Sequence, residues 1–61
     1  MWRYEVAWFN EEGIYTWKGF GHADKFERFL RKLKRKGLEI LSISDWDGEG
    51  VGARLKKQYL G

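Results

Sequence analysis

Apolar and polar residues alternate along the first twenty positions of the chain. The run from Trp2 to Phe9 (WRYEVAWF) alternates and is rich in β-favouring side chains, which predicts a strand with one buried face. The segment Asn10-Glu11-Glu12-Gly13 predicts a four-residue turn, since glycine readily adopts positive φ. The run from Ile14 to Phe20 then predicts the returning strand of a β-hairpin.

The pairing of these two strands decides which side chains share a face. Pairing Phe9 with Ile14 places Glu5 opposite Lys18, and this opposite-charge pair favours that register. The side chains that it directs toward the core are Trp2, Tyr4, Val6, Trp8, Tyr15 and Trp17. Those expected on the uncovered face of the sheet include Phe9, Ile14 and Phe20.

A helix is predicted next. Asp24, followed three residues later by Glu27, is typical of a capping box at a helix start. Gly37 is expected to end the helix in the left-handed conformation. Between these ends the apolar residues follow a helical spacing and predict one buried stripe, made of Phe26, Phe29, Leu30 and Leu33.

The C-terminal part predicts a second hairpin. Leu38 to Trp46 (LEILSISDW) is rich in apolar and β-branched residues, Asp47-Gly48 is a strong turn signal, and Val51 to Leu60 completes a fourth strand. The lysines of this last segment suit an edge strand. The expected fold is therefore α+β in the order ββαββ, a four-stranded sheet with one amphipathic helix packed on one face, in a single domain spanning residues 1–61.

This order and length of elements resembles the minimal β-grasp topology of small immunoglobulin-binding bacterial domains. The resemblance involves no sequence motif. It implies the sheet order second-first-fourth-third and carries no function. An antiparallel sheet with the first strand beside the third is the alternative.

Length and composition narrow the class of protein. Sixty-one residues fit one domain, and the absence of cysteine excludes disulfides and cysteine-ligated zinc while suiting a reducing compartment. No apolar run approaches the ~18 residues of a membrane span, and the first residues lack a signal-peptide core. These features predict a soluble cytoplasmic protein with no membrane association.

No constellation of residues in the sequence indicates catalysis or metal binding. Residues 45–50 have the acidic spacing of a calcium loop, but Lys56 stands where a bidentate glutamate is required. The glycine-rich residues 48–52 lack the Gly-Lys-Ser/Thr of a phosphate-binding loop. His22 belongs to no recognisable catalytic set. We therefore expect no metal, no cofactor and no enzymatic activity.

Charge is concentrated in the predicted helix. Residues 23–37 contain seven basic and two acidic side chains, whereas the segments before and after each carry a net charge of −1. Like charges three and four residues apart repel, so this concentration has no evident structural benefit. The side chains expected to contact nucleic-acid phosphates are Arg28, Arg31, Lys32 and Arg35, with Lys25 and Lys36 at the margins.

The leading hypothesis is a small non-enzymatic binding module that contacts nucleic acid through this basic face; an acidic protein could take its place. The alternative is a protein-interaction module, a small adaptor or inhibitor encoded by a phage or another mobile element, or a homodimer, each using the open sheet face with Phe9, Ile14 and Phe20. A third interpretation is a designed or model folding domain without biological function.

Overall fold

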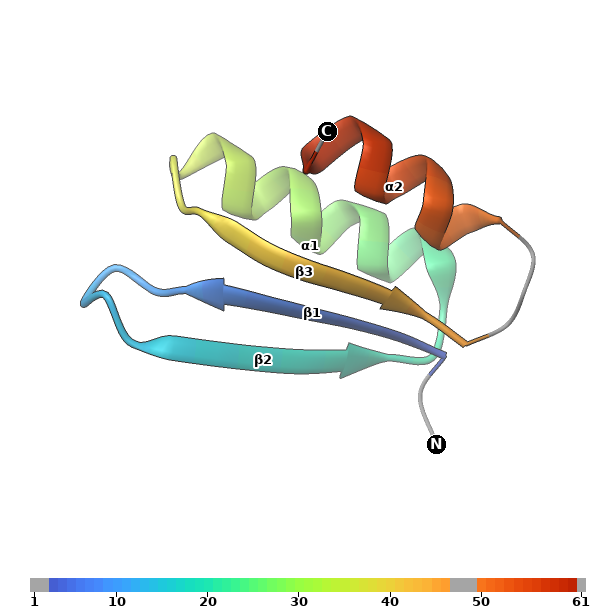
Figure 1. Ribbon diagram of the computed structural model, residues 1–61, viewed down its shortest axis with the longest axis horizontal. Helices are drawn as coiled ribbons and strands as arrows, with labels where there is room; N and C mark the ends of the chain where they lie inside the picture. Colours follow the sequence, from blue (N-terminus) through green and yellow to red (C-terminus); the bar gives the residue numbers. More distant parts are fainter. Residues whose placement is uncertain (1–2, 47–49, 61) are drawn as a thin grey trace.

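Three strands and two helices follow one another along the chain. The computed structural model describes residues 3–46 and 50–60. In chain order the elements are β1 (Tyr4–Phe9), β2 (Tyr15–Phe20), α1 (Ala23–Arg35), β3 (Ile40–Asp45) and α2 (Val51–Tyr59) (Figure 1). The predicted four-stranded sheet with one helix is therefore wrong: the sheet has three strands, and the fourth predicted strand is a helix.

The turn of the β1–β2 hairpin is one residue shorter than predicted. The Asn10 N–H donates to the Ile14 carbonyl at 3.0 Å, so these two residues pair and only residues 11–13 form the loop. The Asn10 side-chain oxygen accepts the N–H groups of Glu12 and Ile14 at 2.9 and 3.0 Å. Gly13 has φ of +77°, as expected of a three-residue hairpin loop that ends in a left-handed residue.

This shorter loop shifts the hairpin register by one residue, so each β2 side chain lies on the face of the sheet opposite to the predicted one. Phe9 pairs with Tyr15 and Ala7 with Trp17, instead of the predicted pairing of Phe9 with Ile14. Because side chains alternate across a strand, a slip of one residue moves the whole set to the other face. Tyr15 and Trp17, predicted to be buried, are 60% and 54% exposed, whereas Phe20 turns inward.

Helix α1 begins two residues earlier than predicted and lacks the capping box. Its N-cap is His22, which makes no side-chain hydrogen bond, and Asp24 lies within the first turn. The C-terminal prediction is confirmed, since Gly37 has φ of +75°. The N–H groups of Gly37 and Leu38 donate to the carbonyls of Lys34 and Leu33 at 3.0 and 3.1 Å, the pair of bonds of a Schellman motif.

Strand β3 lies antiparallel to β1, which gives the sheet order β2-β1-β3. The β-grasp order implied by the resemblance is wrong, and the first strand lies beside the third, as in the alternative. Ala7 pairs with Ser42 and Trp8 with Ile40, so a bulge interrupts the ladder between these two pairs. The predicted turn at Asp47-Gly48 lies outside the described residues.

Residues 51–59 form a helix because their apolar side chains recur at helical spacing. Val51, Leu55 and Tyr59 are four residues apart, and all three contact the core. A strand would have placed these three side chains on one face together with Ala53 and the charged Lys57. Burial of Leu55, which is 1% exposed, instead attaches α2 to the helix-covered face.

Both helices cover the same face of the sheet and leave the other face open (Figure 1). The side chains of the core cluster come from β1, α1, β3 and α2, and they are Tyr4, Val6, Trp8, Phe26, Leu30, Leu33, Ile43 and Leu55. Phe20 packs on the rings of Phe26 and Phe29, with centroids 5.5 and 5.1 Å apart. The result is a small compact α+β domain with a radius of gyration of 10.8 Å. No helix in the described part of the chain is long and apolar enough to cross a membrane.

Candidate functional site

The four central basic residues of the sequence prediction lie together on the outer side of α1. The helix buries Phe26, Leu30 and Leu33 against the sheet. Its opposite side carries exposed side chains that line a surface hollow of about 360 Å³, and they are Arg28, Arg31, Lys32 and Arg35. We call this set the basic face. Its residues recur at the same helical spacing as the buried residues Phe26, Leu30 and Leu33, but on the opposite side of the helix, so they lie together.

Acidic side chains do not neutralise the basic face. Among residues 3–46 and 50–60, ion pairs join only Lys36 to Glu11, at 3.3 Å, and Arg54 to Glu27. None of the four residues of the basic face takes part in either pair. Four cations within about two helical turns therefore face solvent without a counter-charge from the described chain.

The two marginal residues of the prediction differ in their surroundings. Lys36 is partly compensated by its ion pair with Glu11. Lys25 lines a separate hollow of about 270 Å³ together with Arg28 and Lys32, over the rings of Phe20 and Phe29. Lys25 thus extends the basic face toward β2, whereas Lys36 contributes less free charge.

Lys18 is a basic residue of this region that the sequence analysis missed. Its Nζ lies 5.3 Å from the ring centroids of both Phe20 and Phe29, within the range of a cation–π contact. The predicted register had placed Lys18 on the opposite face, beside Glu5. Only the correct length of the Asn10–Ile14 turn would have revealed that Lys18 belongs with the basic helix.

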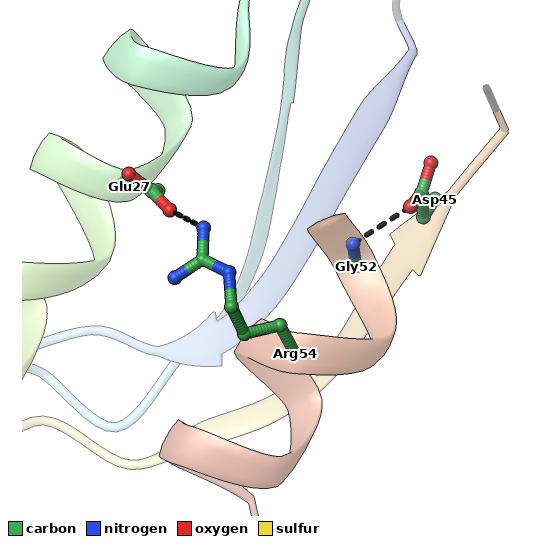
Figure 2. Close-up of polar contacts among 4 residues, drawn as sticks. All are labelled: Glu27, Asp45, Gly52 and Arg54. Atoms are coloured by element: carbon green, nitrogen blue, oxygen red, sulfur yellow. Dashed lines mark hydrogen bonds and ion pairs between the residues drawn. The ribbon is translucent and has the colours of Figure 1, made fainter. Parts of the chain in front are cut away.

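The side of α1 that faces α2 has its charges compensated. Figure 2 shows the Arg54 guanidinium of α2 reaching the Glu27 carboxylate of α1. Lys34 lies 5.7 Å from the ring centroid of Tyr59. These contacts lie between the two helices, and they leave the unpaired cations of α1 on its outer side.

The open sheet face is a second, chemically different surface. The sequence predicted Phe9, Ile14 and Phe20 here, but Phe20 lies on the helix-covered face and Ile14 lies at the end of the turn. The aromatic residues that occupy the open face are Phe9, Tyr15 and Trp17. A hollow of about 360 Å³ on this face is lined by Glu5, Ala7, Tyr15, Trp17, Ser42 and Ser44, with Val6.

Within the described ranges 3–46 and 50–60, no group of three or more His, Asp or Glu side chains is placed to hold a metal ion. His22 lies exposed at the start of α1. Residues 48 and 49 of the glycine-rich segment lie outside the described residues, and its residues 50–52 form the start of α2.

The comparisons with known proteins give no relative. No protein-family model matches the chain, and no curated protein or solved structure matches it either.

Proposed function

We propose that the protein binds the phosphate backbone of nucleic acids through the basic face of α1. One observation carries this proposal: four exposed cations line a single hollow on one helix and have no acidic partner in the described chain. Clustered like charges cost a few tenths of a kcal/mol per pair in an isolated helix. A polyanion removes that cost and adds direct attraction.

The chemistry of the side chains favours phosphate over a single carboxylate. Three of the four residues are arginines, whose planar guanidinium groups present forked donors that match phosphate oxygens. From Arg28 to Arg35 the helix rises by about 10 Å at 1.5 Å per residue. Side chains spread over that length reach several consecutive phosphates, where a lone acidic side chain would satisfy only one of them.

Such contacts fix the protein on the backbone and carry no sequence information. Binding then depends on the release of counterions, and it weakens steeply as salt is added. We therefore expect comparable affinity for unrelated sequences of equal length.

The proposal is tested by fluorescence anisotropy of a labelled 20-base-pair DNA duplex, titrated with protein between 50 and 200 mM NaCl. Tryptophan emission is a poorer probe, since the exposed Trp17 and Trp46 do not line the basic face. With three to four phosphate contacts, the plot of log Kobs against log salt has a slope of about −2.7 to −3.6. Replacing Arg28, Arg31, Lys32 and Arg35 together with Gln abolishes the salt-dependent binding.

Thermal unfolding of the same quadruple variant is the control. Removal of like-charge pairs stabilises the helix by about 0.2–0.5 kcal/mol per pair, and loss of cations near its C-terminus offsets part of this gain. The Tm is therefore unchanged or slightly higher. Undiminished binding by a folded quadruple variant contradicts the proposal.

A further inference from the structure

The open sheet face holds a carboxylate among aromatic rings. Glu5 lies on β1, the central strand, between Gly19 of β2 and Ser44 of β3. It is half-buried, and its carboxylate makes no hydrogen bond or ion pair with any residue of the described chain. Arg3, which directly precedes this strand, forms no ion pair with it.

The hairpin register builds the hollow around this carboxylate. Trp17 pairs with Ala7, and Glu5 pairs with Gly19, so these two side chains each have a small cross-strand neighbour. Tyr15, two residues from Trp17 on β2, has its side chain on the same face. The rings of Tyr15 and Trp17, together with Glu5 and two serines, therefore line a hollow of about 360 Å³.

This set of groups favours a cation. Tyrosine and tryptophan rings attract cations over their faces, and a carboxylate adds a charge-assisted hydrogen bond. A phosphate would be repelled by Glu5, so the chemistry of this hollow is opposite to that of the basic face. Among natural cations, guanidinium fits best, because it is planar, stacks on aromatic faces and presents forked donors to a carboxylate.

We propose that the open sheet face is a second binding site, which takes an arginine side chain of a partner peptide. The guanidinium lies over the rings of Trp17 and Tyr15 and donates to the Glu5 carboxylate, while the hydroxyls of Ser42 and Ser44 accept its remaining N–H groups. The site lies on the opposite side of the sheet from α1. Arginine binding at this site can therefore be tested independently of phosphate binding by the helix.

The test uses a capped peptide with one arginine between glycines, and a matched peptide with citrulline, which keeps the shape and lacks the charge. Binding is followed by changes in the ¹H–¹⁵N spectrum of the protein. Saturable shifts with the arginine peptide, centred on Glu5, Tyr15 and Trp17, are expected. The citrulline peptide should bind at least fivefold more weakly, as should the arginine peptide to Glu5→Gln.

Trp17→Thr and Trp46→Thr are a matched pair of variants. Both residues are exposed tryptophans, at 54% and 69%, but only Trp17 lines the hollow. Trp17→Thr is expected to lose peptide binding and Trp46→Thr to retain it. Both variants should remain folded, as shown by a cooperative thermal unfolding transition. Equal binding of the two peptides, no saturable shift with either, or equal loss in both variants overturns the proposal.

Sedimentation velocity tests whether a second copy of the chain, instead of a peptide, covers this face. With the hollow open to peptide, the protein sediments as a monomer, and Trp17→Thr leaves its mass unchanged. A dimer that Trp17→Thr converts to a monomer shows that a second copy covers this face, and the arginine site is then wrong.

Discussion

Gly52 lies close to strand β3 of the sheet. Its N–H donates to the Asp45 carboxylate at 2.7 Å (Figure 2), and a Cβ added at Gly52 would lie 2.1 Å from the Asp45 Cβ. A real side chain cannot occupy that space, so β3 and the start of α2 would have to separate. The absence of a side chain, rather than backbone freedom, is what this position requires.

We therefore predict that Gly52→Ala destabilises the protein, although alanine favours helices by about 1 kcal/mol over glycine. Overpacking of this kind costs about 1–3 kcal/mol, which lowers the Tm of a domain this small by on the order of 10 °C. Thermal unfolding followed by circular dichroism measures the change. Gly21→Ala is the matched control: nothing lies within 4 Å of its added Cβ, so its Tm should stay level or rise. A rise with Gly52→Ala would show that the contact with Asp45 is not tight.

At the same scale, the prediction of the open face depended on the position of Asn10 in the hairpin. The positive φ of Gly13 was foreseen, but the sequence does not show whether Asn10 belongs to the loop or to the first pair of the ladder. The side-chain hydrogen bonds of Asn10 place it in the pair. That single step exchanges Phe20 for Tyr15 and Trp17 on the open face, so this surface could not be predicted correctly.

At the scale of elements, α2 depends on one buried side chain. Leu55 is 1% exposed and belongs to the core cluster with residues of β1, α1 and β3, whereas the neighbouring Leu60 is 41% exposed. The ion pair of Arg54 with Glu27 is exposed on the Arg54 side and contributes at most about 1 kcal/mol. Attachment of the second helix therefore rests mainly on apolar burial.

Leu55→Ala is predicted to cost about 2–5 kcal/mol, since it empties a site that the surrounding core encloses. The whole stability expected of 61 residues, at about 0.05–0.15 kcal/mol per residue, is only about 3–9 kcal/mol. Urea denaturation should show a much lower midpoint or an unfolded protein. Leu60→Ala should change the stability by less than about 0.5 kcal/mol. Equal effects of the two substitutions would contradict the position of α2.

Elements with a complete set of local signals were predicted, and α2 was not. The amphipathic stripe and the C-terminal glycine of α1 are local, and the structure confirms both. The Asp47-Gly48 pair before residues 51–60 indicated a hairpin, and the prediction of a strand overlooked that Val51, Leu55 and Tyr59 lie four residues apart. The N-terminal end of α2 depends on Asp45, seven residues before Gly52, and such a contact leaves no local pattern.

At the scale of the whole molecule, the two faces have opposite chemistry. The helical layer carries the unpaired cations of α1, and the open face carries Glu5 and exposed aromatic rings. The basic face was predictable residue by residue, because helical spacing alone brings Arg28, Arg31, Lys32 and Arg35 together. The contribution of Lys18 was not, because it depends on the hairpin register.

The central claim is that charge on α1, rather than net positive charge, binds nucleic acid. Two double variants separate these possibilities, since Arg31→Gln with Arg35→Gln and Lys56→Gln with Lys57→Gln each remove two exposed cations from a helix. The measurement is the slope of log Kobs against log salt for each variant with one DNA duplex. Loss of two phosphate contacts reduces the magnitude of the slope by about 1.8. We predict this reduction for the α1 variant and a wild-type slope for the α2 variant; equal reductions in both would contradict the account.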